Sequence, residues 1–145
     1  MTKQFELQNI FIRLNLMDGL TKIVAEDNRL QQVMFNLVNN ARDAIAEKRE
    51  NLGLDSEDYI NIDTYEDGKL VYVRVSDTGA GITEEVRNKI FEPFFSTKEV
   101  GYGMGLGLAI TYGIVRDYKG SIDIESEPRN GTSFIISFPA APNEN

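Results

Sequence analysis

The sequence predicts an α/β (α+β) two-layer sandwich, in which helices cover one face of a mixed, mostly antiparallel sheet. Three observations lead to this prediction. The chain has 145 residues, 41% of them apolar, which suits one domain with one core. Short segments rich in alternating or β-branched apolar residues occur in pairs around turns. Two longer segments carry apolar residues at spacings of three and four, which is typical of helices that bury one face.

The first half of the chain predicts a strand followed by a long helix. Apolar residues alternate over residues 5–16, the segment M-D-G-L-T ends this strand, and the short apolar segment 23–25 is expected to pair nearby. The spacing then changes, so we expect an amphipathic helix from about Asn28 to Arg49. Asp27 is the expected N-cap, because its carboxylate can accept a hydrogen bond from an amide of the first turn.

The second half predicts two hairpins with helices between them. Thr83 is expected to open a short helix toward Phe91, because a hydroxyl followed by two glutamates is typical of a helix start. The other predicted elements are strands at 59–65 and 70–75 around the turn E-D-G-K, a helix at 106–118, and strands at 121–125 and 132–138 around the turn P-R-N-G. We expect a single domain over residues 1–139 and a tail over residues 140–145.

Composition excludes several classes of function. With 15 basic and 23 acidic residues the net charge is −8, which disfavours a nucleic-acid partner. The absence of Cys excludes disulfides, thiolate metal sites and cysteine nucleophiles, and fits a cytoplasmic protein. The absence of His means that any histidine chemistry must involve another polypeptide segment. No apolar run approaches about 18 residues, so we expect no direct membrane contact by this domain.

A polar stripe borders the apolar face of the expected long helix. It consists of Asn36, Asn40, Asp43 and Glu47. Amide oxygens at such a border can hold a hydrated divalent cation, of the kind that accompanies nucleotide phosphates. The alternative is that these side chains only form hydrogen bonds on a half-exposed helix, and the motif taken alone favours that alternative.

The segment D-T-G-A-G at 77–81 follows an expected strand. A carboxylate at Asp77 can accept a hydrogen bond from the exocyclic amine of adenine, whereas guanine presents an acceptor there, and the glycines permit close backbone approach. By itself this segment is more often an ordinary turn. Gly131 and Thr132 have a similar pair of interpretations: a hairpin turn, or a hydroxyl that supports an adenine pocket beside Asp77.

Glycine occupies every second position from 101 to 107, directly before an expected helix. Exposed amides at a helix start attract oxyanions, and Lys98 just before the glycines could reach a phosphate. Taken alone, the glycines also fit a flexible loop, and Lys98 fits a solvated surface lysine. The segment F-E-P-F-F-S-T-K at 91–98 fits either core packing or the anchor of a lid.

Together, N-L-V-N-N-A at 36–41, D-T-G-A-G, F-E-P-F-F-S-T-K and G-M-G-L-G-L at 103–108 make the chain resemble the catalytic, ATP-binding domain of sensor histidine kinases. This is the Bergerat fold of the GHKL superfamily, shared with gyrase B, the Hsp90 chaperones and the MutL mismatch-repair proteins. The resemblance covers essentially the whole chain. It implies that ATP lies between the long helix and a flexible lid over about residues 93–105. The segments N-N-A-R-D-A and E-P-F-F-S-T-K are most similar to the nitrogen-regulation subclass.

The resemblance also implies the roles of individual residues. Asn40, helped by Asn36, would coordinate Mg²⁺, and Asp77 would bind the adenine amine. The implied ATP-binding set is Asn36, Asn40, Asp43, Asp77, Gly79, Gly81, Ile82, Lys98, Gly103, Gly105, Leu106, Gly107, Leu108 and Thr132. Many family members carry Lys three residues after the metal asparagine, where this chain has Asp43, so Lys98 becomes the preferred phosphate contact.

The reaction follows from the same resemblance. Family members that hydrolyse ATP carry a glutamate base one turn before the metal asparagine, and Asn36 stands there in this chain, which favours phosphoryl transfer over hydrolysis. In the kinases the nucleophile is a histidine on a separate dimerisation domain. We therefore expect the catalytic part of a two-component kinase whose parent carries the acceptor histidine and then feeds a response regulator. The expected location is cytoplasmic, whether or not the parent is anchored in a membrane.

Two other functions fit the same fold. One is an anti-sigma-factor serine kinase, which the extended E-P-F-F-S-T-K segment and the long lid disfavour. The other is a non-catalytic module that senses ATP or docks onto a partner, which the completeness of the four motifs disfavours. Acid lability of the phosphorylated product separates a histidine kinase from a serine kinase.

Overall fold

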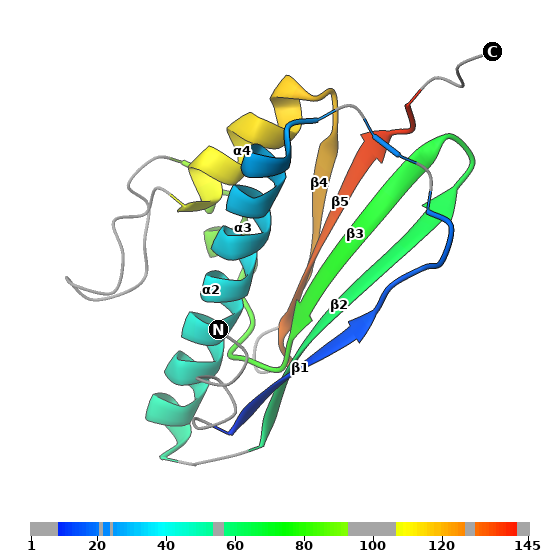
Figure 1. Cartoon of the computed structure of the whole chain (residues 1–145). Helices are drawn as coiled ribbons and strands as arrows, with labels where there is room; N and C mark the ends of the chain where they lie inside the picture. The colour runs from blue at the N-terminus through cyan, green and yellow to red at the C-terminus, as the bar shows by residue number, and fades with distance from the viewer. Residues whose placement is uncertain are drawn as a thin grey trace.

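The structure, a computed structural model, describes residues 9–20, 22–23, 25–53, 57–92, 107–126 and 130–141. Figure 1 shows two layers, a twisted sheet and a layer of helices on one of its faces. The elements are β1 (Ile10–Asn15), α2 (Asp27–Leu52), β2 (Asp58–Asp67), β3 (Leu70–Asp77), α3 (Glu84–Arg87), α4 (Gly107–Asp117), β4 (Ser121–Ser126) and β5 (Thr132–Pro139).

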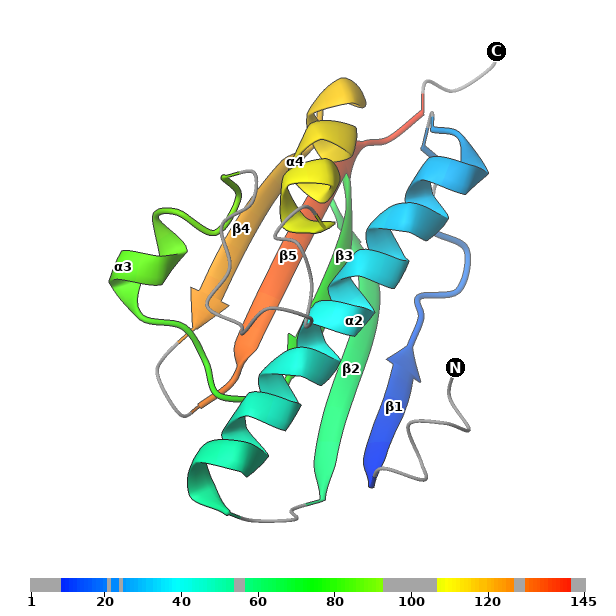
Figure 2. The same ribbon diagram turned by 90° about the vertical axis from the view of Figure 1, so that its left-hand side faces the viewer.

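The strands of the described residues form one five-stranded sheet in the order β1-β2-β3-β5-β4. Only β1 runs parallel to its neighbour β2, and the other three pairings are antiparallel. Figure 2 shows α2 lying across the strands of this sheet, with α4 beside it and α3 near β4. The predicted fold class, a mixed and mostly antiparallel sheet covered on one face by helices, is therefore confirmed.

The core lies between this sheet and the two longer helices. Its central side chains are Leu37 and Ile45 of α2, Ile60 of β2, and Phe134 and Ile136 of β5, none more than 2% exposed. Each such side chain contributes about 1.5–3 kcal/mol to folding by leaving water. The apolar stripe of α2 is thus explained by burial against alternating positions of the central strands.

The helix boundaries differ slightly from the sequence predictions. Helix α2 starts at Asp27, so this residue lies in the first turn, and the N-cap is Glu26, whose backbone is extended. The Asp27 cap was therefore wrong. The amides of Arg29 and Leu30 donate to the Glu26 carbonyl at 3.1 Å, while the Glu26 amide donates to the Tyr118 hydroxyl. The helix start therefore has no side-chain cap, and the N-cap residue is tied by its amide to Tyr118, just after α4.

The predicted Thr83 cap is confirmed, because its hydroxyl accepts a hydrogen bond from the Val86 amide at 3.3 Å. The helix itself is only four residues long, and turns continue the chain to Phe91. The Phe91 ring contacts the rings of Tyr112 on α4 and Phe134 in the core. This ring therefore anchors the last described residues before 93–106 to the helix layer.

Strands β2 to β5 extend somewhat further than their sequence patterns, whereas β1 ends at Asn15, one residue before the predicted end, and residues 5–8 of the predicted strand lie outside the described residues. β3 includes Asp77, because its ladder with β5 continues to the pair Asp77 and Thr132. In the short apolar segment, Ile23 forms an isolated bridge with Ala140, near the other end of the chain, rather than pairing nearby as predicted. The amide of Ala141 donates to the Lys22 carbonyl at 2.7 Å, so ordered packing extends two residues past the predicted domain boundary. No helix in the described part of the chain is long and apolar enough to cross a membrane.

Candidate nucleotide site

Asp77 is a buried carboxylate at the end of β3. It is 7% exposed, and its Oδ1 accepts a hydrogen bond from the Gly79 amide at 2.8 Å. Burial raises the pKa of Asp77 to about 6, although backbone hydrogen bonds from Gly79 and Thr132 and the charge of Lys48 act in the opposite direction. No Lys or Arg within the described residues forms an ion pair with it. A buried carboxyl of this kind is a candidate ligand-binding group.

The turn after Asp77 is pressed against helix α2. A Cβ on Gly79 would lie 2.6 Å from the carbonyl carbon of Ala44, so only glycine fits without a shift of backbone. The next amide, that of Ala80, donates to the Ala44 carbonyl at 3.1 Å. Gly81 follows with φ of +73° and turns the chain toward α3. Gly79 is therefore required by the close contact with α2, and Gly81 by the change in backbone direction.

Residues at the ends of β4 and β5 also lie beside Asp77 and the loop that follows it. Thr132 is buried beside Asp77, and its hydroxyl is 2.9 Å from that of Ser126. Ser126 also donates to the Gly131 carbonyl and accepts from the Ile82 amide. Ser126 was not predicted from the sequence, because a serine at the end of a strand carries no signal of its own. Ser126 joins the loop after β3 to the turn before β5.

The polar stripe of α2 divides into two kinds of residue. The Nδ2 of Asn36 donates to the Gly107 carbonyl at 3.0 Å and to the Thr111 hydroxyl at 3.2 Å, and its Oδ1 accepts from Gln32. Asn36 thus ties α2 to the first turn of α4. By contrast, the half-buried Asn40 makes no side-chain hydrogen bond with any residue that the structure describes.

Asp43 lies one turn further along α2 than Asn40. Its carboxylate is 3.5 Å from the guanidinium of Arg42, and the Asp43 side chain is 18% exposed. Asp43 thus continues the polar stripe, with part of its negative charge balanced by a neighbouring cation.

The phosphate half of the predicted site is only partly described. Gly107 begins α4, and Leu108 packs partly buried against the core. Lys98, Gly103, Gly105, Leu106 and the lid over 93–105 lie outside the described residues. Among described groups of His, Cys, Asp and Glu, none of three or more is arranged to hold a metal ion.

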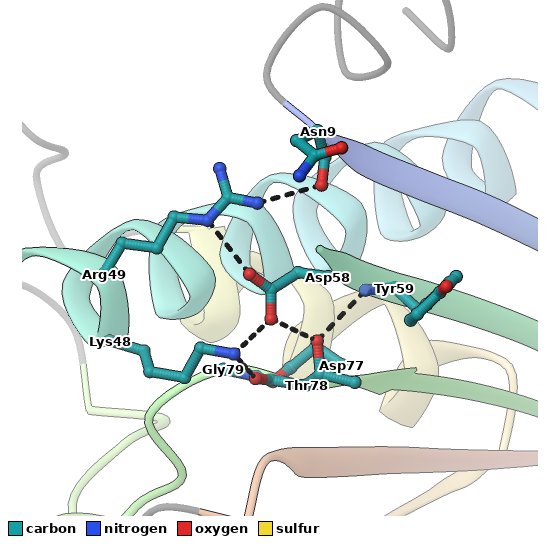
Figure 3. Close-up of polar contacts among 8 residues, drawn as sticks. All are labelled: Asn9, Lys48, Arg49, Asp58, Tyr59, Asp77, Thr78 and Gly79. Carbon is teal, nitrogen blue, oxygen red and sulfur yellow. Dashed lines mark hydrogen bonds and ion pairs between the residues drawn. The ribbon is translucent and has the colours of Figure 1, made fainter. Parts of the chain in front are cut away.

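A buried charge cluster on the far side of the Asp77 turn was not predicted. Figure 3 shows Lys48 and Arg49, at the end of α2, reaching the carboxylate of Asp58 at the start of β2. Lys48 also donates to the Thr78 carbonyl at 2.7 Å, and the Thr78 hydroxyl donates to Asp58 at 2.7 Å. Asp58 is fully buried. The sequence contained no signal for this cluster, because it depends on which helix end meets which strand start.

The comparisons with known proteins agree with this arrangement. Residues 25–142 match the family model described as "Histidine kinase-, DNA gyrase B-, and HSP90-like ATPase". The chain is 39% identical over 136 residues to Sporulation kinase A of Bacillus subtilis, and 34% identical over 132 residues to Sensor histidine kinase ZraS of Escherichia coli. These matches cover 94% and 91% of this chain but only 21% and 26% of the two relatives. The chain thus spans about a quarter or less of their length.

Two solved structures are also similar. One is a nucleotide-free catalytic domain of the histidine kinase ThkA, with a TM-score of 0.78 and 32% identity, covering 97% of this chain and 86% of that one. The other is full-length ShkA in complex with AMPPNP, with a TM-score of 0.79 and 27% identity, covering 99% of this chain and 28% of that one. The chain therefore belongs to the histidine kinase-, gyrase B- and HSP90-like ATPase family, and within it to the catalytic domains of two-component sensor histidine kinases.

Proposed function

We propose that this domain binds magnesium-ATP and transfers the γ-phosphate to a histidine on a separate dimerisation and phosphoacceptor domain of a longer parent protein. The sequence contains no His, so the acceptor must lie outside these residues. The relatives named above are much longer than this chain, which supports a parent with further domains. The receiver domain of a response regulator would take the phosphate next.

The observation that carries this proposal is the buried carboxylate of Asp77. Its neighbours donate through backbone amides, and no cation among the described residues neutralises it by an ion pair. Burying such a group is costly unless a ligand supplies a matching donor. The exocyclic amine of adenine is such a donor, whereas the corresponding oxygen of guanine is an acceptor and would face the carboxylate unfavourably. Asp77 would thus select adenine.

The surroundings of Asp77 fit the flat base of a nucleotide. The Gly79 amide holds the carboxylate and Gly81 turns the backbone beside it, while Ile82 and Thr132 would contribute an apolar and a hydroxyl surface. A base that enters this space would find a wall already fixed by the hydrogen bonds of Ser126. We therefore assign the adenine pocket to these residues.

The polar stripe of α2 fits a hydrated magnesium ion. Mg²⁺ carried with nucleotide phosphates keeps several waters and needs few protein ligands, which suits an amide oxygen better than a cluster of carboxylates. Asn40 is the stronger candidate, because its side chain has no hydrogen-bond partner in the described structure. Asn36 would contribute mainly by holding α4, and Asp43 would face the hydration shell. The ion would neutralise phosphate charge during transfer.

The start of α4 fits the phosphates themselves. Its first amides, at Gly107 and Leu108, lack partners within the helix and would attract oxyanions. Gly103, Gly105, Leu106 and Lys98 complete this half of the proposal through sequence position alone. The nitrogen-regulation subclass likewise rests on the sequence motifs.

Transfer is favoured over hydrolysis by the chemistry of Asn36. An amide cannot act as a general base for water, and this one already links α2 to α4. Phosphoryl transfer depends mainly on positioning and charge neutralisation, so the domain can present the γ-phosphate to an external nucleophile. Because this reaction requires ATP, we propose a cytoplasmic location for the domain.

The names of the relatives favour a histidine acceptor over a serine acceptor. Phosphorylation of the parent protein with γ-labelled ATP tests this. We expect a label that is lost in acid and retained in base, and that is absent from Asp77→Asn. An acid-stable label would instead support a serine kinase. Tight ATP binding without any label would support a sensing or docking module.

A further inference from the structure

The charge cluster behind the adenine pocket is centred on Thr78, the residue between Asp77 and Gly79. The Thr78 amide donates to the Tyr59 carbonyl at 3.2 Å, and its hydroxyl accepts from the Tyr59 amide at 3.0 Å. The same hydroxyl donates to Asp58, and the Thr78 carbonyl accepts from Lys48. Thr78 is therefore fixed at both backbone polar groups and at its side chain (Figure 3).

Lys48 connects the Asp58 carboxylate to the backbone of the turn after Asp77. Its ammonium group donates both to the Asp58 carboxylate and to the Thr78 carbonyl, and its side chain is 17% exposed. Lys48 lies on the same helix as Ala44, which holds Ala80 through its carbonyl. One helical turn of α2 therefore contacts the backbone on both sides of Gly79.

We propose that Lys48 is a positioning residue for base selection, which fixes the Thr78 peptide and thereby aims the Asp77 carboxylate at the exocyclic amine of adenine. This inference rests on the proposed function of the site and deepens it. The Thr78 carbonyl and the Gly79 amide belong to one planar peptide group, so rotation of this peptide would move the amide that donates to the Asp77 Oδ1. Small errors in the position of a hydrogen-bonding group reduce selectivity before they reduce general affinity.

Lys48 also acts on Asp77 through its charge. The groups that face Asp77 are Lys48 from α2, Asp58 from β2, and the backbone amides of Thr132 on β5 and Gly79 in the turn. Among them the charge of Lys48 lowers the pKa of Asp77, while that of Asp58 raises it. Loss of the Lys48 charge would therefore move the pKa of Asp77 further upward, and the carboxyl would be neutral over a wider pH range.

Arg49 provides a matched control. It donates to the other oxygen of Asp58 at 2.9 Å and to the Asn9 carbonyl at 2.9 Å, on the side of β1. Removing either cation leaves Asp58 with one of its two basic partners. Only removal of Lys48 also releases the Thr78 carbonyl. The variants Lys48→Met and Arg49→Met thus each remove one ion pair with Asp58. Only Lys48→Met also removes the hydrogen bond to the Thr78 carbonyl.

The test is calorimetric titration of the whole chain with ATP and with purine riboside triphosphate, whose base lacks the exocyclic amine. We expect the unaltered chain to prefer ATP, Lys48→Met to lose about tenfold in ATP affinity and little in purine-analogue affinity, and Arg49→Met to keep the preference. Lys48→Arg should restore it. The pH below which ATP binding weakens should be higher for Lys48→Met than for Arg49→Met.

Equal preference for ATP in Lys48→Met and Arg49→Met would overturn the inference while leaving the proposed function intact. Failure of the unaltered chain to discriminate between the two nucleotides would instead overturn the proposed function. If Lys48→Met does not fold, Lys48→Gln serves, because it removes the charge and keeps a donor. The inference then requires a smaller loss of preference in the same direction, and an unchanged preference contradicts it.

Discussion

The two halves of the candidate site are built differently. On the proposed adenine side, Asp77 is buried, and several hydrogen bonds hold its turn against α2, β2 and β4. On the proposed phosphate side, the Asn36 side chain joins α2 to the start of α4, and Leu108 packs partly buried against the core. The turn around Asp77 is therefore held by polar contacts from several elements, whereas the polar contacts at the described start of α4 come from Asn36.

The largest expected effect comes from adding a methyl group on the adenine side. Gly131 has φ of +82°, and a Cβ there would lie 2.1 Å from the Asp77 carbonyl oxygen. We expect Gly131→Ala to lower the free energy of unfolding by about 3 kcal/mol or more, measured by urea denaturation. The control is Gly113→Ala in α4, where an added Cβ meets nothing within 4 Å and should stabilise by about 0.5–1 kcal/mol. Equal stability of the two variants would show that the turn is loosely packed.

The second prediction concerns the charge of Asp77. Its pKa is raised from 3.8 to about 6, so its ionisation opposes folding. The stabilising effect of the raised pKa is complete below pH 3.8 and is lost as the pH rises through 6. We therefore expect Asp77→Asn to be more stable than the unaltered chain above pH 6, by up to about 3 kcal/mol, with the difference shrinking toward pH 4.

Thermal unfolding of both proteins across this pH range measures the effect. The same titration should weaken adenine binding as the pH falls below 6, because a neutral carboxyl is a poorer acceptor for the amine. If the difference in stability between Asp77→Asn and the unaltered chain does not change with pH, burial does not raise the pKa of Asp77.

The third prediction tests the phosphate side. Asn36→Ala removes the contacts with Gly107 and Thr111, and we expect a loss of about 1–2 kcal/mol in unfolding free energy together with faster amide exchange in the first turn of α4. Gln32→Ala, which removes only a donor to the Asn36 side chain, should cost less than about 0.5 kcal/mol. Unchanged exchange in Asn36→Ala would mean that other contacts hold α4.

The smallest effect is expected on the sheet face away from the helices. Arg74 and Glu125 form an ion pair of 2.9 Å with side chains 34% and 64% exposed. Arg74→Ala should cost about 0.5 kcal/mol or less, and this cost should decrease at high salt. If Arg74→Ala lowers the free energy of unfolding as much as Asn36→Ala does, the contacts of the candidate site are no more important for stability than an exposed ion pair on the sheet.

Much of this molecule was predictable from sequence where the signal is local. The apolar spacing of α2 and the paired strands predicted the layers and the two hairpins. The pairing of β3 with β5, which places Asp77 beside Thr132, joins the two hairpins and had no local signal in the sequence. The N-cap of α2 was predicted at Asp27, a usual capping residue type, whereas the structure has Glu26 there without a side-chain cap, and the Glu26 amide donates to Tyr118, far away in sequence. A local pattern cannot report such a contact.

The supporting residues of the site were less predictable for the same reason. Lys48 and Arg49 look like ordinary surface residues of a helix end, and Asp58 looks like a loop residue. They form a buried cluster only because α2 ends where β2 begins. Asn36 was expected beside a metal ion, and its contact with Gly107 required knowledge of where α4 starts. Motifs therefore indicated the candidate ligand-binding residues, and the structure showed which residues hold the described ones in place.

The most direct test of the account is calorimetric titration of this chain with a non-hydrolysable ATP analogue, with and without Mg²⁺. The account predicts magnesium-dependent binding by the unaltered chain. Asp77→Asn should weaken it by about tenfold or more under both conditions, and Asn40→Ala should remove only the gain from Mg²⁺. The assignment of the nucleotide site would be contradicted if the unaltered chain does not bind the analogue. It would also be contradicted if both variants bind it as tightly as the unaltered chain does.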